Sequence, residues 1–295
     1  MTRYLRYLLI VLLLSSTAQA AETVVPVYQW LRCADPKPDL SVYGIRDDAK
    51  FAGHWELFPR DDDGKPDLSG WINEERARHH LKGLAPGTPV FLNIEQSNGG
   101  EEWATYKIVN YNPKFRKRGM ALRLRLLEWI RKEVNPSLRL GFYQQPGGWG
   151  GLILNRPEKW HEYVRQLAPM LQAQDISIPQ FYFTKTSGMY GKGLEDALLY
   201  SERYFDAMQF YAPSTPVWPV VWPCWYDLWR ETPPAQNTVE HRDGCAISGH
   251  AWRAILGYCL SRSDGLFIWN QGGAPWDHSA PHWRVTRELI QVEGE

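Results

Sequence analysis

The heptapeptide Pro-Val-Phe-Leu-Asn-Ile-Glu at residues 89–95 is a β-branched and aromatic run that ends in an acid. The glycine-containing segment Gln-Ser-Asn-Gly-Gly follows at residues 96–100 and predicts the end of a strand. Asn93 and Glu95 are two positions apart, so in an extended strand both side chains point to the same side. An amide and a carboxylate at the mouth of a buried strand suit the protonation of a leaving group. We therefore predict the functional site here.

On both sides of this heptapeptide, strand-like runs alternate with helix-like runs. The predicted strands are residues 24–30, 53–58, 89–95, 138–144, 176–183, 215–222 and 265–270. The predicted helices are residues 71–82, 120–134, 157–172, 194–210, 246–260 and 282–292. This alternation is typical of a parallel α/β protein, and it predicts a distorted (β/α) barrel of TIM type with seven strands. An open doubly wound sheet is the alternative, but no glycine-rich phosphate turn follows the first strand.

The first twenty residues resemble a secretion signal. Arg3 and Arg6 provide the positive start, residues 8–14 the apolar centre, and Ala-Gln-Ala at residues 18–20 the small-residue cleavage pattern. The apolar run is shorter than the roughly 20 residues that a membrane span needs, and no later segment qualifies. We expect an exported, periplasmic or secreted chain that begins near Ala21, with residues 21–295 forming a single domain.

The composition of the chain limits which kinds of partner and cofactor we expect. Lys plus Arg and Asp plus Glu number 33 each, so no overall charge indicates binding to nucleic acid or to a membrane. The eight histidines are scattered without a ligand motif, so we predict no metal and no cofactor. The four cysteines permit disulfides in an exported chain. Cys224 and Cys245 are the preferred pair, although three pairings of the four cysteines are open.

In a parallel barrel the active site lies at the carboxyl ends of the strands. The predicted ends are rich in aromatic and amide side chains and poor in charges, a lining that suits sugar rings and hydroxyl groups. The members of this set are Gln29, Trp30, Glu56, Asn93, Glu95, Tyr143, Gln145, Tyr182, Trp222, Trp225, Tyr226, Asp227, Trp269, Asn270 and Gln271. The sequence therefore predicts a carbohydrate as the partner.

Hydrolysis of a glycosidic bond usually needs two carboxyl groups. Glu95 is the best candidate for the general acid, because an unpaired acid at a buried strand end is costly without a role. Its neighbour on the same face, Asn93, is not an acid. One acid suffices where a 2-acetamido group of the substrate acts as the nucleophile, and Asn93 would then orient that group.

These stretches together resemble the hyaluronidase family of glycoside hydrolases. The segment Leu-Asn-Ile-Glu at residues 92–95 occupies the place of the family's Asp-x-Glu. Further similar segments are Val-Pro-Val-Tyr-Gln-Trp at 25–30, Ala-Gly-His-Trp-Glu-Leu-Phe at 52–58, Leu-Gly-Phe-Tyr at 140–143, Ser-Ile-Pro-Gln-Phe-Tyr at 177–182, Pro-Val-Trp-Pro-Val at 216–220 and Asp-Gly-Leu-Phe-Ile-Trp at 264–269.

The resemblance implies a distorted seven-stranded barrel in which Glu95 is the acid and position 93 orients the acetamide. It also implies that Tyr182 contacts the acetamido sugar and that Trp269 lines the substrate site. Asn93 replaces the family's Asp, and the Asp-Trp-Glu-Glu-Trp-Arg signature is missing. Both departures favour a distant, bacterial-type relative with another substrate or with impaired catalysis.

Three functions remain open. The leading one is a glycoside hydrolase in which Glu95 is the acid and Asn93 orients the sugar. Its substrate-binding residues are Tyr143, Gln145, Tyr182, Trp222, Tyr226, Asp227, Trp269 and Asn270. A barrel that binds glycans without cleaving them is the second. The third is an ordinary two-carboxylate glycosidase in which Asp227 or Glu56 is the partner of Glu95.

Overall fold

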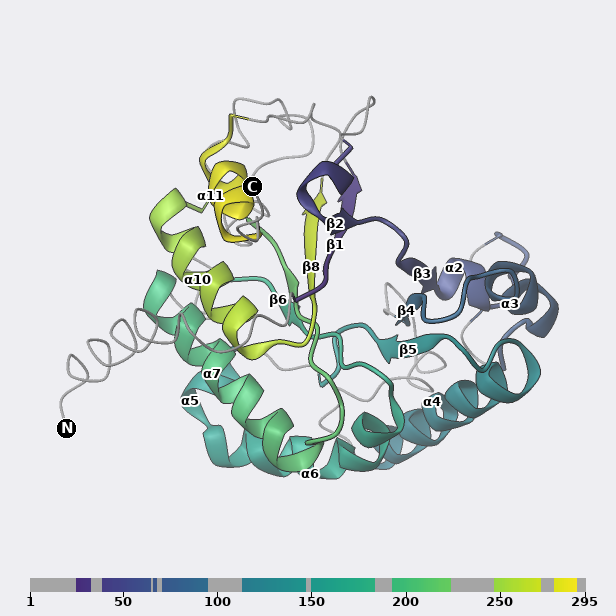
Figure 1. Ribbon diagram of the computed structural model, residues 1–295. Coiled ribbons are helices and arrows are strands. Elements are labelled where there is room, and N and C mark those ends of the chain that lie inside the picture. The colour runs from purple at the N-terminus through teal and green to yellow at the C-terminus, as the bar shows by residue number, and fades with distance from the viewer. Residues whose placement is uncertain are drawn as a thin grey trace.

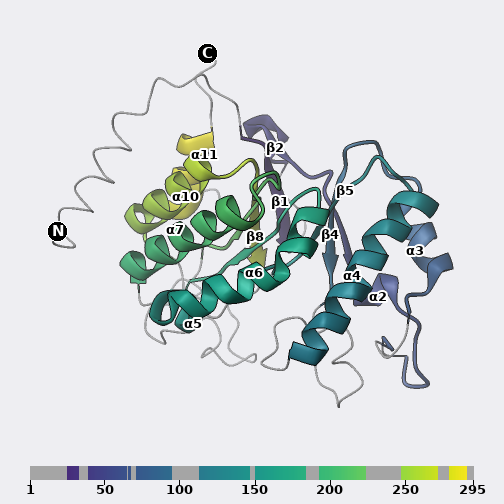
Figure 2. The same ribbon diagram turned by 90° about the horizontal axis from the view of Figure 1, so that it is seen from below.

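The computed structural model describes residues 25–32, 39–64, 66–67, 71–94, 113–146, 150–183, 193–223, 247–271 and 279–290. Parallel strands form the centre of the molecule, and helices cover them on the outside (Figure 1; Figure 2). In these parts of the chain, no helix has the length and apolar character needed to cross a membrane.

The strands form two parallel sheets that follow one another around a ring. One sheet has the order β2-β1-β8-β7-β6 and the other β3-β4-β5. A bridge between Tyr143 and Ile178 connects β5 to the chain just before β6, whereas no ladder joins β2 to β3 in the described residues. The bounds are β1 Val27–Arg32, β2 Ile45–Arg46, β3 Lys50–Gly53, β4 Pro89–Asn93, β5 Arg139–Phe142, β6 Gln180–Phe181, β7 Val220–Val221 and β8 Leu266–Gln271. The fold is a distorted, incompletely closed β/α barrel, as predicted.

The helices follow the strands in the chain and pack outside them. They are the 3-10 helix η1 Ser41–Tyr43 and the α-helices α2 His54–Leu57, α3 Glu74–Leu81, α4 Pro113–Glu133, α5 Gly150–Asn155, α6 Pro157–Ala173, α7 Gly193–Tyr211, α10 Gly249–Arg262 and α11 Pro281–Ile290. Leu126, Leu127 and Ile130 of α4 are buried at the helical spacing seen in the sequence. The six predicted helices are confirmed with shifted ends, and α5 is an addition.

Two apolar layers show which side chains of the strands face the helices and which face the barrel interior. Along β4, Val90 and Leu92 pack toward the helices, whereas Phe91 packs into the barrel. The residues of this interior layer, called the inner cluster below, are Tyr28, Phe91, Tyr143, Ile176, Ile178, Tyr182, Trp218, Val220, Trp222, Phe267 and Trp269. Because side chains alternate along a strand, Asn93 faces the same side as Phe91, which is the interior of the barrel.

The second predicted strand, residues 53–58, is wrong. The strand β3 ends at Gly53, and residues 54–57 form the one-turn helix α2. The carboxylate of Glu56 accepts a hydrogen bond of 2.9 Å from the Gly53 N–H. This contact with the residue three positions earlier is the capping arrangement that starts a helix. The short polar and apolar pattern of this segment fits one helical turn as well as it fits a strand.

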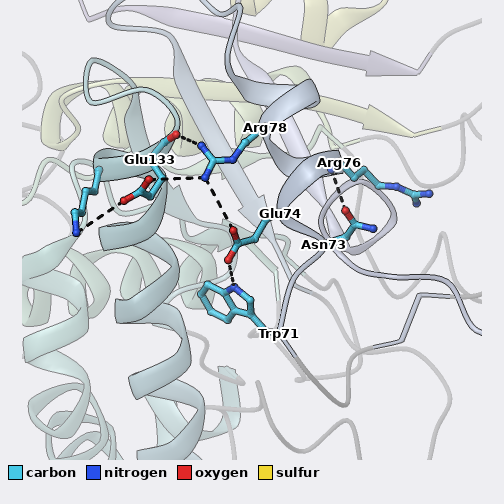
Figure 3. A network of polar contacts seen from close by, with 7 residues as sticks. Trp71, Asn73, Glu74, Arg76, Arg78 and Glu133 are labelled. Atoms are coloured by element: carbon cyan, nitrogen blue, oxygen red, sulfur yellow. Dashed lines mark hydrogen bonds and ion pairs between the residues drawn. The ribbon is translucent and has the colours of Figure 1, made fainter.

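Helix α3 is fixed to the end of α4 by a polar network (Figure 3). The Arg78 guanidinium lies 4.0 Å from the Glu74 carboxylate and 3.8 Å from the Glu133 carboxylate, and it also donates to the Glu133 carbonyl. At the start of α3, Asn73 Oδ1 accepts from the Arg76 N–H at 3.0 Å. The Asn73 N–H donates to the Leu57 carbonyl at 2.8 Å, so the same helix holds α2 in place.

Cys259 is a buried free cysteine on α10. Burial raises the pKa of its thiol, so the group behaves as a small apolar side chain. The preferred disulfide partners, Cys224 and Cys245, lie outside the described residues.

Candidate functional site

Asn93 is the last residue of β4 and is only 6% exposed. Its Oδ1 atom has no hydrogen-bond partner within the described parts of the chain. A buried acceptor without a donor is costly, and it faces the barrel interior beside Gly53, its register partner on β3. This geometry suits an acceptor that a bound N–H group would satisfy.

Aromatic rings from three neighbouring strand ends meet on the opposite side of the ring of strands. Tyr182 and Trp269 stack with their ring centroids 4.9 Å apart and an interplanar angle of 7°. Trp222 lies 4.8 Å from Trp269 and 5.3 Å from Tyr182 by the same measure. Trp222 is fully buried, so in this structure it supports the other two rings and presents no surface of its own.

A phenol pair connects this aromatic group to β5. The hydroxyl oxygens of Tyr143 and Tyr182 lie 2.7 Å apart, and both side chains are buried. The Tyr182 ring is therefore held twice, by the hydrogen bond of its hydroxyl group to Tyr143 and by stacking on Trp269. Each hydroxyl group can donate one hydrogen bond and accept others, which suits contact with a sugar hydroxyl or an amide.

Three glutamines lie within two positions of Tyr143 or Tyr182 in the sequence. Gln145 is buried, and its backbone carbonyl accepts from Ser177 Oγ at 2.9 Å. The side chain of Gln144 donates to Gln180 Oε1 at 2.6 Å, across the junction of β5 and β6. Gln144 has φ of 61°, an uncommon conformation for a residue other than glycine. The sequence argument named Gln145 and missed Gln144 and Gln180, although both are amides at predicted strand positions.

Several predicted site residues cannot be placed. Glu95, Trp225, Tyr226 and Asp227 lie outside the described residues. The structure places the backbone of Asn270 in β8, next to Trp269. The site as described therefore unites Asn93, Tyr143, Gln145, Tyr182, Trp222 and Trp269 at the carboxyl ends of β4 to β8.

Among the described residues, Glu56 is a carboxylate at this rim. It belongs to α2, directly after β3, and its Oε2 atom contacts the Gly53 N–H. The pKa of the adjacent His54 is lowered, mainly because the ring is buried. The charge of Glu56 raises this pKa and the charge of Arg60 lowers it, both to a smaller extent. His54 is therefore neutral at neutral pH and is not a competing cation beside Glu56.

The fold is similar to that of bee venom hyaluronidase. Its monoclinic crystal structure aligns with a TM-score of 0.58 at 13% sequence identity, over 84% of this chain and 91% of that chain. A structure of bee venom hyaluronidase in complex with a hyaluronic acid tetramer aligns with a TM-score of 0.55 at 13% identity, over 84% and 90% of the two chains. No protein-family model matches the sequence, and no curated protein matches it either. At this identity the likeness shows the barrel fold.

Proposed function

We propose that the protein is a glycoside hydrolase that acts on a polysaccharide or an oligosaccharide. Glu95 is the general acid, and Asn93 orients a 2-acetamido group of the sugar. The observation that carries the proposal is the buried Oδ1 of Asn93, which lacks a partner among the described residues and faces the barrel interior. An acetamido N–H is the donor that this atom needs.

The chemistry follows from one acid and one orienting amide. The acetamido carbonyl oxygen attacks the anomeric carbon, and the bond to the leaving oxygen breaks as Glu95 gives that oxygen its proton. Water then opens the cyclic oxazolinium ion and returns a proton to Glu95. Asn93 Oδ1 accepts from the acetamido N–H and so holds the carbonyl toward the anomeric carbon, which raises the effective concentration of the nucleophile.

The aromatic group supplies binding in this proposal. The stacked rings of Tyr182 and Trp269 form a rigid wall, and the Tyr143 hydroxyl fixes the Tyr182 hydroxyl at 2.7 Å. Tyr143, Gln145, Tyr182, Tyr226, Asp227, Trp269 and Asn270 are the proposed substrate-binding residues, and the buried Trp222 supports the Tyr182 and Trp269 rings. The signal-like residues 1–20 support export of the chain. An exported protein can reach a polymeric glycan outside the cell membrane.

The test is release of reducing ends by the purified protein on glycans with and without 2-acetamido groups. We expect release only from acetamido sugars, and its loss in Glu95→Gln, because an amide does not donate the required proton. Glu75→Gln is the matched control, since Glu75 is exposed on α3. Unchanged release by Glu95→Gln would exclude Glu95 as the acid, and release from plain glucans would favour a second carboxylate.

The alternative is a barrel that binds glycans without cleaving them, and Asn93 in place of an acid is the observation that favours it. Binding without release on the whole panel would support this function. Asn93→Asp separates the two functions: turnover that appears only in this variant identifies a binding protein, whereas turnover already present in the parent identifies a hydrolase.

A further inference from the structure

The carboxylate of Glu56 and the amide of Asn93 belong to neighbouring strand ends. Gly53 and Asn93 are register partners in the parallel β3–β4 ladder, so their side-chain directions lie on the same face. Phe51 and Phe91 are also register partners; Phe91 belongs to the inner cluster, and Phe51 packs against it. Because Gly53 is two residues after Phe51, and Asn93 two residues after Phe91, both positions face the barrel interior.

The missing side chain of Gly53 makes room for the Glu56 carboxylate on this interior face. A Cβ atom at Gly53 would lie 3.1 Å from Glu56 Oε2 and 2.8 Å from a ring carbon of Phe51. Both neighbours therefore lie in the direction in which a Gly53 side chain would point. The Glu56 carboxylate therefore lies on the interior side of the β3 end, and the neighbouring strand β4 ends in Asn93.

Capping explains only part of this arrangement. The hydrogen bond from Gly53 N–H to Glu56 Oε2 starts α2, but a glutamine oxygen would accept that bond equally well. The second observation is independent of the helix: Asn93 Oδ1, on the neighbouring strand end and the same face, is buried without a partner in the described chain. A neutral acceptor and a carboxylate therefore belong to adjacent strand ends at one rim.

Resting on the proposed function, we propose that Glu56 supplies the negative charge that Asn93 lacks. Asn93 accepts the acetamido N–H, and the Glu56 carboxylate stabilises the positive charge that develops as the acetamide becomes an oxazolinium ion. Glu56 forms no bond to the sugar. A carboxylate that is already positioned where positive charge develops lowers the activation free energy of the reaction. It does so without binding the neutral substrate more tightly.

The experiment compares Glu56→Gln with the control Glu75→Gln on the acetamido glycan that the parent cleaves. We expect kcat to fall by about 10²-fold in Glu56→Gln, with little change in KM, because the lost interaction belongs to the transition state. The helix cap survives in this variant, since the glutamine oxygen can still accept from Gly53 N–H. Turnover equal to that of Glu75→Gln would overturn the proposal.

A second variant moves the charge within the site. Asn93→Asp in the Glu56→Gln background puts a carboxylate back on the neighbouring strand end, and we expect it to restore turnover by about tenfold or more. A merely structural role of Glu56 would not be repaired by a charge on another strand. Failure of this double variant, with folding intact, would also overturn the proposal.

Binding of a sugar thiazoline, a stable analogue of the oxazolinium ion, separates this proposal from the proposed function. We expect the parent to bind the thiazoline more tightly than the simple 2-acetamido sugar, and Glu56→Gln to lose about tenfold of that preference. If the parent releases no sugar but shows a preference that Glu56→Gln reduces, hydrolysis fails and the role of Glu56 stands. Equal preference in the parent and in Glu56→Gln would exclude the role of Glu56.

Discussion

The two sides of the barrel mouth are built differently. At the ends of β3 and β4 the structure places a glycine, a carboxylate and a buried amide oxygen without a partner among the described residues. At the ends of β6 to β8 it places Tyr182, Trp222 and Trp269, which pack on one another. The aromatic rings pack on one another, whereas the Asn93 Oδ1 atom of the polar side has no hydrogen-bond partner in the part of the chain that the structure describes. We therefore propose that the aromatic side makes the barrel mouth rigid and that the polar side carries the chemistry.

The largest effect that tests this comparison is expected from Trp269→Ala. This ring stacks on Tyr182 and contacts Trp222, so its removal leaves a cavity between two other rings and lowers the free energy of unfolding by about 3–5 kcal/mol. Denaturant unfolding measures this loss. In the control Trp55→Ala, the ring is 47% exposed and contacts the Arg60 guanidinium and the His54 ring at the surface, so the loss should stay near 1 kcal/mol or less. Equal losses would contradict a self-packed aromatic side.

Gly53→Ala tests the polar side by filling the space that Glu56 uses. The added methyl group would lie 2.8 Å from the Phe51 ring and 3.1 Å from the Glu56 carboxylate, so we expect a loss of about 1–3 kcal/mol in unfolding free energy. Turnover should fall as well, because the carboxylate is displaced.

Gly257→Ala is the matched control for this change. Gly257 lies in α10, and an added Cβ would meet nothing within 4 Å. Alanine there should stabilise the helix by about 0.5–1 kcal/mol. A Gly53→Ala protein with full stability and full turnover would mean that the carboxylate does not depend on this space.

The difference between the two sides also explains what the sequence could reveal. The run at residues 89–95 predicted β4 and the position of Asn93, because a buried strand has a plain apolar pattern that ends in polar residues. Residues 53–58 gave the wrong element, because one turn of helix carries too few residues to establish a period. The Gln144–Gln180 pair depends on how neighbouring strands are placed, which no local pattern encodes. The contact of Glu56 with Gly53 is local, but it became apparent only once the helical turn was known. The sequence placed Tyr182, Trp222 and Trp269 at strand ends, but it did not predict that their rings pack on one another.

A pair of amide substitutions compares the candidate site with the supporting layer. Asn93→Leu removes a buried oxygen that has no partner in the described chain, so stability should stay unchanged or rise by up to about 1 kcal/mol. Gln174→Met removes the oxygen that accepts the Phe142 N–H at 2.6 Å, so it should cost about 1–3 kcal/mol. Thermal and denaturant unfolding of both variants measure the contrast. An equal loss in both would mean that the fold itself pairs Asn93 Oδ1.

The smallest effect concerns His54, next to Glu56. Burial lowers its pKa in the folded protein below the ordinary value of 6.5, so the unfolded chain binds a proton more readily than the folded chain. The stability that depends on neutral His54 is therefore complete above pH 6.5 and is lost as the pH falls below that value. Unfolding free energies of the parent and of His54→Gln between pH 7.5 and 5.5 test this directly. The parent should lose more stability than the variant over this range, and parallel pH profiles would show that His54 is hydrated in the folded protein as it is in the unfolded chain.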